Sequence, residues 1–282
     1  MKQLLLPALL VLACGSRAAA LPARVQDPEA TPATGSDQGE ARAEVTDLAR
    51  NLTKTWGIAV YSIKKGKRET GVYVQSNSMG VIEEADVIQF MDLISFPQMQ
   101  QEMQFQTICN AADGYSLRGV KGKLAMGQLQ IEFTDGHAKG MHVGQTPIDM
   151  EVPVDFVTDF ALLRGLWVTY EPDWEKEFTY LDIESMPKAD CVKTGTMRCL
   201  GEETLEIEGA KYETWKFRWS IPDEAPSFLW YGKEGQLIQR SNRKELWTFS
   251  ASRTEKQTAI AAQPPAGPDG GKGRGKGKKD GK

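Results

Sequence analysis

Hydrophobic and polar side chains alternate along residues 205–249, a stretch that holds four of the seven tryptophans of the chain. Trp215, Phe217 and Trp219, for example, are separated by single polar residues. A period of two places alternate side chains on opposite faces of a β-strand. Turn residues divide the stretch into five hydrophobic segments: Leu205 to Ile207, Trp215 to Trp219, Phe228 to Tyr231, Leu237 to Ile238, and Leu246 to Phe249. The pattern therefore predicts an antiparallel meander with one buried face.

The aromatic residues of this meander need a cover. We expect one sheet face to carry Trp215, Phe217, Trp219 and Trp230. Each ring can bury roughly 150–250 Å² at about 25 cal/mol per Å², so an apolar element must lie against them. Two interpretations are open: the face is ordinary core, or the sheet is curved and its concave face also receives an apolar ligand.

The same period of two continues through the first half of the chain. A hairpin is expected from Trp56 to Gln75, with its turn in the Lys-Lys-Gly-Lys segment, residues 64–67. Glycine, proline and Asp-Gly pairs punctuate the segments that follow. The further predicted strands cover residues 87–94, 103–110, 116–122, 124–134, 138–143 and 177–183.

One segment has helical periodicity. Phe156, Phe160 and Leu163 are spaced i, i+4, i+7, with Asp155 placed to cap the start and Gly165 placed to cap the end. This spacing predicts a short amphipathic helix from Asp155 to Gly165. Its apolar stripe is the expected cover of the aromatic face.

Both ends of the chain differ in composition from the middle. Residues 1–20 begin with Lys2 and a short apolar run, which is typical of a signal peptide and too short for a membrane span. Residues 21–44 are rich in small and polar residues and predict a flexible tether, with a short helix expected over 43–52. A single domain is expected over residues 45–262, followed by a disordered Gly/Lys tail over 263–282.

Two cleavage sites compete in the leader. Val11 to Gly15 resembles a bacterial lipobox, in which Cys14 would carry the lipid, whereas Ala18 to Ala20 offers an ordinary small-residue site. Either site predicts export to the periplasm or cell envelope, with or without a lipid anchor.

The remaining cysteines suggest an oxidising compartment. Cys191 and Cys199 enclose seven residues and predict a disulfide at the base of a hairpin, while a zinc or redox site lacks the usual spacing. Cys109 is expected to be buried and free.

Charge is distributed unevenly around an overall −4. Residues 1–20 carry +2 and residues 263–282 carry +4, so residues 21–262 carry −10. An acidic domain argues against nucleic-acid binding. The basic residues of the tail, over 272–282, could meet an anionic envelope surface or lie on the acidic domain.

Candidate chemistry is sparse. His137 and His142 lie five residues apart, which places them on opposite faces of a straight strand, unless a turn at Gly140 folds them together. Hydrolase, zincin, P-loop and dinucleotide motifs do not occur in the sequence. We therefore expect no enzyme, no metal and no cofactor.

The segment from Gly209 to Leu246 carries a resemblance. Its Gly-x-Lys-Tyr-x-Thr-Trp-Lys strand, proline break and Leu-Trp-Tyr-Gly-Lys-Glu-Gly-Gln-Leu-Ile run resemble the closing strands of uncharacterised bacterial exported proteins related to the LolA-like lipoprotein carriers. The resemblance implies a half-barrel: a curved antiparallel sheet around a short helix, with an apolar concavity and no catalytic residues. It extends over residues 56–255.

The expected fold is therefore mainly β. Two functions follow from it. The first is an exported protein that holds a lipid or another apolar molecule between Phe156, Phe160 and Leu163 of the helix and Trp215, Phe217, Trp219 and Trp230 of the sheet. The second is a structural or interaction module tethered at the envelope, with no small-molecule ligand.

Overall fold

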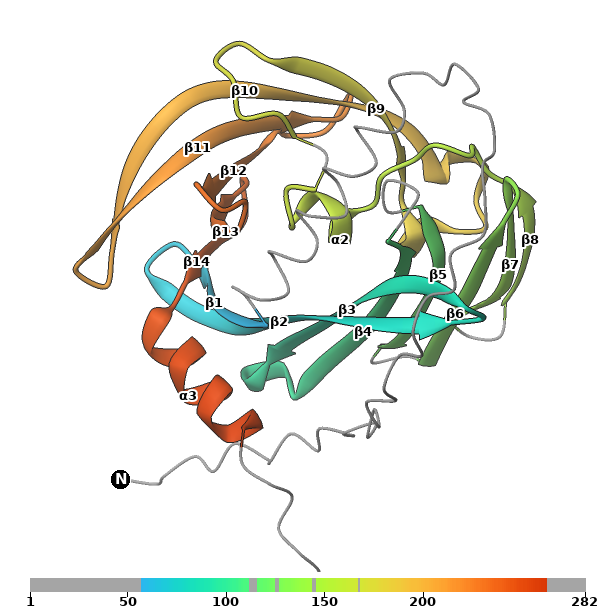
Figure 1. Cartoon of the computed structure of the whole chain (residues 1–282), viewed down its shortest axis with the longest axis horizontal. Coiled ribbons are helices and arrows are strands. Elements are labelled where there is room, and N and C mark those ends of the chain that lie inside the picture. Colours follow the sequence, from blue (N-terminus) through green and yellow to red (C-terminus); the bar gives the residue numbers. More distant parts are fainter. Residues whose placement is uncertain (1–56, 112–115, 125–126, 144–145, 167, 263–282) are drawn as a thin grey trace, which may run out of the picture.

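A single antiparallel sheet of fourteen strands curls around a short helix, α2 (Figure 1). The computed structural model describes residues 57–111, 116–124, 127–143, 146–166 and 168–262. The strands of the first half are β1 (Ile58–Lys65), β2 (Arg68–Ile82), β3 (Ala85–Phe96), β4 (Gln101–Asn110), β5 (Leu117–Leu124), β6 (Gly127–Thr134), β7 (His137–His142) and β8 (Thr146–Glu151). Those of the second half are β9 (Glu175–Leu181), β10 (Val192–Ile207), β11 (Ala210–Ser220), β12 (Ser227–Gly232), β13 (Leu237–Ser241) and β14 (Leu246–Phe249).

The order of the strands explains why a helix lies inside the curve. The sheet runs from β8 back to β1 and continues from β14 to β9, so β8 and β9 are its two edges. The chain leaves one edge after β8 and must reach the other edge to begin β9. The connection between these edges contains α2 (Asp159–Leu162), which lies within the concavity (Figure 1).

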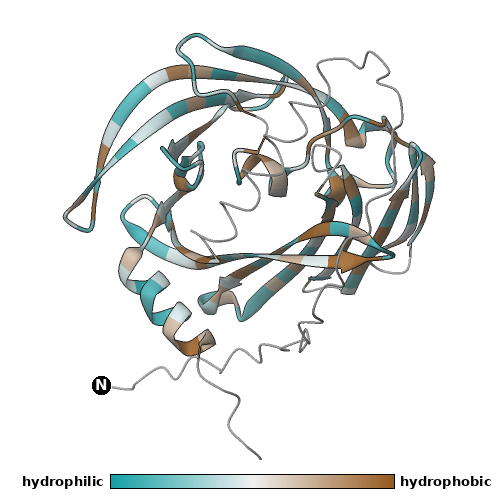
Figure 2. Cartoon of the chain, in the orientation of Figure 1, coloured by the Kyte–Doolittle hydropathy of each residue, from teal (hydrophilic) through white to brown (hydrophobic). Residues whose placement is uncertain are grey.

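The predicted mainly β fold is confirmed as an open, curved antiparallel sheet. The meander of residues 205–249 forms β10 to β14, and hydrophilic and hydrophobic residues alternate along β10 and β11 (Figure 2). The hairpin turn between these two strands has positive φ at Glu208 (52°) and Gly209 (81°). Two successive positive φ values match the right-handed twist of a hairpin, and glycine accepts them readily.

One strand and one α-helix were not predicted. Strand β8 contains Pro147, which is tolerated because β8 is an edge strand. Helix α3 (Ala251–Ala261) has no buried residue, so it lacks the apolar stripe by which a helix is recognised. Three short 3-10 helices complete the described elements: η1 (Pro97–Met99), η2 (Ile183–Ser185) and η3 (Ala189–Cys191).

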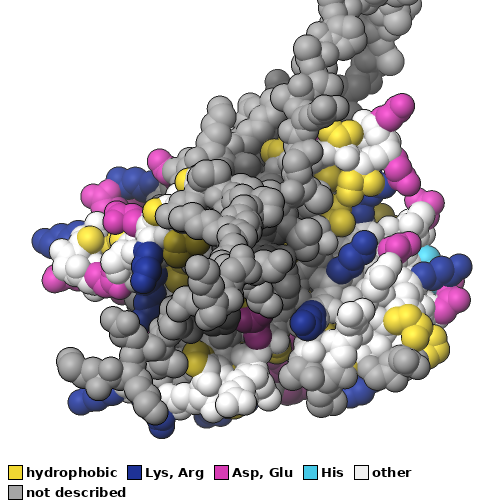
Figure 3. All heavy atoms as spheres, turned by 90° about the horizontal axis from the view of Figure 1, so that it is seen from below, with side chains coloured by type: hydrophobic (Ala, Val, Ile, Leu, Met, Phe, Trp, Pro, Cys, Tyr) yellow, Lys and Arg dark blue, Asp and Glu magenta, His cyan; other side chains and the backbone are white. Residues whose placement is uncertain are grey.

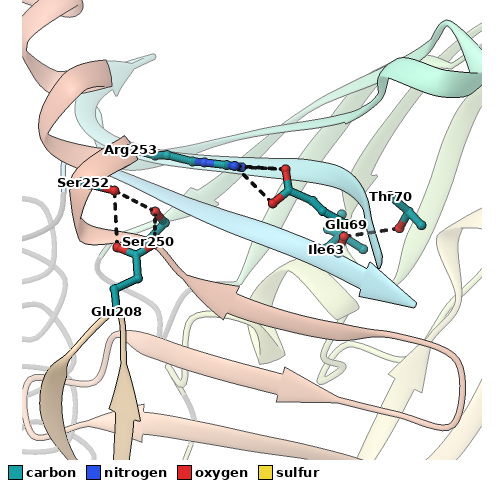
Figure 4. A network of polar contacts seen from close by, with 7 residues as sticks. All are labelled: Ile63, Glu69, Thr70, Glu208, Ser250, Ser252 and Arg253. Carbon is teal, nitrogen blue, oxygen red and sulfur yellow. Dashed lines mark hydrogen bonds and ion pairs between the residues drawn. The ribbon is translucent and has the colours of Figure 1, made fainter. Parts of the chain in front are cut away.

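Polar contacts tie α3 to the sheet (Figure 4). The carboxylate of Glu208 accepts hydrogen bonds from the hydroxyls of Ser250 (2.7 Å) and Ser252 (3.3 Å) at the start of the helix. The guanidinium of Arg253 binds the carboxylate of Glu69 on β2 at 3.0 Å. These contacts join the β10–β11 hairpin, α3 and β2 at one place.

The core consists of two main clusters of buried side chains. The larger one lies on the concave face of β1, β2 and β9 to β14 and includes Phe217, Trp219 and Tyr231. The second lies on β4 to β8 and also includes Leu181, the last residue of β9, and Ile183, which follows it. Because the end of β9 packs among residues of β4 to β8, the two edges of the sheet approach each other.

Candidate binding site

The predicted aromatic face is only partly correct. Phe217 and Trp219 are buried in the concave cluster, and Trp215 packs against it. Trp230, in contrast, is paired in register with Lys216, and both residues lie on the convex face. Its indole nitrogen donates to Glu203 at 3.0 Å, and the Lys216 ammonium lies 4.9 Å from the ring centroid. Strand register, which the sequence does not contain, therefore places Trp230 away from the expected concavity.

The predicted helix is also shorter than expected. It covers Asp159–Leu162 with Thr158 at the N-cap, because Val157 is held by β9: its amide donates to Thr179 and its carbonyl accepts from Leu181, at 2.8 and 2.9 Å. Gly165 does follow the helix with a φ of 61°. The stripe of Phe156, Phe160 and Leu163 is thus not one helix face.

These three residues lie in different surroundings. Leu163 is buried in the concave cluster with Phe217 and Trp219. Phe156 packs with the second cluster, and its ring centroid lies 5.4 Å from that of Phe133. The side chain of Phe160 lies outside the described part of the structure, as do Cys14, the leader, the tether and the tail.

The predicted disulfide is wrong. Cys191 and Cys199 are both free and buried, in different clusters. Cys191 ends η3, and Cys199 lies eight positions on, within β10, which begins at Val192. An extended strand rises about 3.3 Å per residue, so the two cysteines are far beyond the roughly 7 Å that a disulfide can bridge. Cys109 is buried and free as predicted, and burial raises the pKa of its thiol to about 12.

A buried ion pair holds the chain after α2 against the sheet. The guanidinium of Arg164 lies 2.8 Å from Asp92 of β3 and 4.3 Å from the centroid of Phe90, and both charged side chains are fully buried. The Tyr73 hydroxyl donates to the same oxygen of Asp92, and Asn77 accepts from Arg164 at 3.3 Å. Burial and the Asp92 charge raise the pKa of Tyr73. The chain after α2 therefore occupies the centre of the concavity and is held there by this buried polar network.

A hydrogen bond from Tyr231 also holds α2 against the sheet. Its hydroxyl donates to the carbonyl of Leu162, the last residue of the helix. A buried tyrosine hydroxyl requires a partner, and an unsatisfied helix carbonyl supplies one. Burial raises the pKa of Tyr231, so it stays a neutral donor.

Sequence analysis missed this network, although one signal was present. Asp92 interrupts the hydrophobic run of β3, and Arg164 interrupts that of the helix segment. A charged residue inside an apolar run indicates a buried charge that needs a partner. The partner could not be named because 72 residues separate the two.

An open cleft lies along the seam between the two sheet edges. This cleft of about 770 Å³ is lined by the β6–β7 turn, the segment 152–157 and residues 176–179 of β9. We call it the seam cleft. Three aromatic side chains contribute to it: Phe133, Phe156 and Phe178. Of the residues predicted to bind ligand, Phe156 lines this cleft.

Phe178 connects the seam cleft with the concave cluster. Its ring centroid lies 6.5 Å from that of Trp219 and 6.4 Å from that of Trp174. On the cleft side, the ammonium of Lys176 lies 5.1 Å from the Phe178 ring. The apolar wall of the cleft is thus continuous with the aromatic core of the sheet.

Charged side chains of both signs lie at or next to the seam cleft, as they do elsewhere on the described surface (Figure 3). Arg118 forms an ion pair with Glu83 at 2.7 Å, and His137 contacts Asp149 at 2.5 Å. The hydrogen bond from His137 lowers the pKa of Asp149. Lys176 has no ion-pair partner among the residues described. The cleft can therefore offer apolar contact at its wall and polar contact at its rim.

Among the described residues, no group of three or more His, Cys, Asp or Glu side chains is placed to hold a metal ion. His137 and His142 both lie on β7, and His137 is occupied by Asp149. No helix within the described residues is long and apolar enough to cross a membrane.

Comparisons with known proteins give distant likenesses only. No known protein family and no curated protein match the chain. Among solved structures, a beta-barrel-like protein of unknown function from Brucella abortus is 11% identical, with a TM-score of 0.44 over 68% of this chain and 94% of that one. The hypothetical lipoprotein YmcC from Escherichia coli is 13% identical, with a TM-score of 0.27 over 77% and 97%. A protein from Pseudomonas aeruginosa is 10% identical, with a TM-score of 0.36 over 58% and 87%.

Proposed function

We propose that the protein is an exported, non-enzymatic cell-envelope protein that binds an apolar or amphipathic molecule in the seam cleft. The observation that carries the proposal is an open cleft of about 770 Å³ whose lining combines Phe133, Phe156 and Phe178 with charged residues such as Lys176. Sites for small molecules are concave, have apolar walls and occupy roughly 300–1,000 Å³. Export rests on the predicted leader, and the relation to LolA-like carriers stays a prediction.

The position of the ligand differs from the one expected from the sequence. Between α2 and the sheet, Leu163, Phe217 and Trp219 are buried against one another, and the Arg164–Asp92 pair holds the connection in place. The seam cleft is open by comparison, since Val154 on its wall is 76% exposed. An acyl chain would lie along the half-buried Phe156 and the exposed Val154 while its polar end remained near Lys176, with the buried Phe133 and Phe178 behind them.

Binding of a fluorescent fatty-acid analogue tests this proposal. We expect saturable binding to the full-length protein and a loss of about tenfold or more in Phe156→Ala, because the variant removes a ring from the cleft wall. Phe228→Ala is the matched control, since Phe228 is a half-buried aromatic residue on the convex face. It should bind the analogue as the parent does.

A third variant separates the two locations. If Trp219→Leu abolishes binding in folded protein while Phe156→Ala does not, the ligand lies within the concave cluster and the seam cleft is the wrong site. Absence of saturable binding by the parent at micromolar protein would reject the carrier function altogether. Native mass spectrometry of protein from its own host would report any retained ligand and any lipid on Cys14.

A second function, an interaction module, is favoured by the edge of β9. Val157 pairs with β9 at Tyr180 only, so the outward backbone groups of Glu175 and Glu177 have no strand beside them in the described residues. An unpaired strand edge can accept an extended peptide as a further strand. Capture of an extended segment that is lost when Glu177 is replaced by proline, with the fatty-acid analogue unbound, would support this function.

A further inference from the structure

Two neighbouring hairpin turns at one end of the sheet are strongly basic. Strand β1 pairs with β14, so the β1–β2 turn lies beside the β13–β14 turn, and Lys65 reaches Glu245 at 3.6 Å. Residues 64–69 hold four basic residues and one acidic, and residues 241–245 hold two and one. We call the cationic side chains of the two turns the basic rim: Lys64, Lys65, Lys67, Arg68, Arg243 and Lys244.

Three acidic residues near the basic rim are already paired, whereas the exposed Asp223 of the β11–β12 loop has no ion-pair partner among the described residues. Glu69 binds Arg253, Glu245 contacts Lys65, and Glu224 of the adjacent β11–β12 loop contacts Lys193 at 3.0 Å. Four of the rim residues form no ion pair or side-chain hydrogen bond with the described residues: Lys64, Lys67, Arg243 and Lys244. Positive charge at this end is therefore available for an external partner.

The basic rim is fixed in shape on the β13–β14 side. The side-chain oxygen of Asn242 accepts hydrogen bonds from the amides of Lys244 and Glu245, both at 2.8 Å. An asparagine that binds the backbone two and three residues ahead stabilises a turn. The two exposed cations of this turn, Arg243 and Lys244, are thus presented by a defined backbone.

An exposed hydrophobic residue lies next to the rim. Arg68 donates to Gln98 of η1 at 2.7 Å, and the following residue, Met99, is 56% exposed. Pro97 of the same short helix is also exposed. Basic residues grouped with an exposed apolar side chain are typical of surfaces that bind a bilayer, where the cations meet anionic headgroups and the apolar group enters the interface.

We propose that the basic rim is a docking surface for a lipid bilayer that carries anionic headgroups. The exposed Met99 favours a bilayer over a soluble polyanion, because a bilayer has an apolar interior that the side chain can enter and a soluble polyanion does not. Strand direction places the rim at the end of the sheet opposite to the β6–β7 turn of the seam cleft. A protein docked by the rim would keep the cleft open to solvent.

The same chain offers a matched control. Lys67→Glu/Lys244→Glu reverses one exposed charge on each turn of the rim. Lys211→Glu/Lys233→Glu makes the same change of net charge at the hairpin turns of the opposite end, after β10 and β12. Both variants keep the basic tail, so its contribution is equal in the two.

Sedimentation with vesicles of phosphatidylglycerol and phosphatidylcholine measures docking. We expect the full-length protein to bind these vesicles and not vesicles of phosphatidylcholine alone, with binding weakened by salt. The rim variant should bind at least about tenfold more weakly than the parent, and the control variant within about twofold. Met99→Ser should weaken vesicle binding while leaving binding to heparin unchanged.

Several outcomes would overturn the proposal. Equal loss in the rim and control variants would show a net-charge effect, and binding that survives in the rim variant would place the contact elsewhere. Heparin binding without vesicle binding would assign the rim to a soluble polyanion. Binding of the fatty-acid analogue is measured in solution without vesicles. A protein that does not dock on vesicles can therefore be distinguished from one that does not bind the analogue in the seam cleft.

Discussion

The centre of the concave face and the seam cleft use similar side chains for different purposes. At the centre, aromatic rings are sealed by the connection after β8, which is anchored by Arg164 and Tyr231. At the seam, Phe133 and Phe156 contact each other beside a segment that pairs with β9 at one residue only. Aromatic content alone therefore does not locate a binding site. The two regions differ in whether the chain that crosses the rings is anchored there. At the centre the connection is anchored over the rings, whereas at the seam Phe156 stays half-buried beside the exposed Val154.

The connection between the sheet edges accounts for this difference. A curved antiparallel sheet of this order must send the chain across its own concavity to reach the second edge. The segment fills the centre, where it can bury apolar side chains against the larger cluster. It leaves the seam cleft where it crosses the seam, because the sheet edges there do not hydrogen-bond to each other.

The largest expected effect comes from breaking the anchor at the centre. Asp92→Ala leaves the buried guanidinium of Arg164 without its carboxylate, and such a change costs about 3–5 kcal/mol of unfolding free energy. Urea denaturation at neutral pH measures the loss. Val154→Ser in the seam cleft should change stability by less than about 0.5 kcal/mol, because the side chain is exposed.

A double variant sharpens the interpretation of Asp92→Ala. Asp92→Leu/Arg164→Met removes both charges and fills the volume with apolar groups, which often restores the stability that a broken pair loses. If the double variant were no more stable than Asp92→Ala, an unpaired charge would not be the cause of the loss.

A smaller effect is expected where β10 passes beneath Trp219. A Cβ atom on Gly195 would lie 2.0 Å from the Trp219 ring, so Gly195→Ala must displace that ring from the core. Overpacking of this kind costs about 1–3 kcal/mol. Thermal unfolding measures the change, and Thr194→Ala, at the exposed neighbouring position, serves as the control. A Gly195→Ala protein as stable as its parent would contradict the tight packing of the concave face.

The sequence allowed much of the strand pattern to be predicted, because alternation is a local property. The faces of Phe217 and Trp219 follow from a period of two, and both lie in the concave cluster. The turn at Gly209 follows from local backbone preference. Elements without a hydrophobic period, such as α3, could not be recognised in this way.

The misplaced site residues have non-local causes. Trp230 faces outward because its strand is in register with Lys216, and register depends on which strands pair. Phe156 lies outside the helix because the next residue, Val157, pairs with Tyr180 of β9, which is 23 positions away in the sequence. Cys191 directly precedes the long strand β10 and Cys199 lies within it, whereas the disulfide required a hairpin. The seam cleft exists only once both sheet edges are in place, so no local pattern could reveal it.

The smallest expected effect concerns pH and the chain that leaves β9. Burial pushes the pKa of Asp182 upward, but hydrogen bonds from Ser185 and Lys193 outweigh this and hold it below its ordinary value of 3.8. Because the folded-state pKa is the lower one, the carboxylate stabilises the fold above about pH 4 and loses this effect as pH falls through the folded-state pKa. Asp182→Asn should therefore lower the unfolding free energy by about 1 kcal/mol or less at pH 7.

The test compares urea midpoints of parent and Asp182→Asn at pH 7 and pH 3. The difference between the two proteins should shrink at the lower pH, where the parent carboxylate begins to take up a proton. Asp223→Asn removes an exposed acid on a loop and should give no such trend. A difference that persists unchanged at pH 3 would mean that Asp182 acts through hydrogen-bond geometry. One carboxylate oxygen accepts from the Ser185 amide and the other from the Ser185 hydroxyl and Lys193, and an asparagine has only one acceptor oxygen.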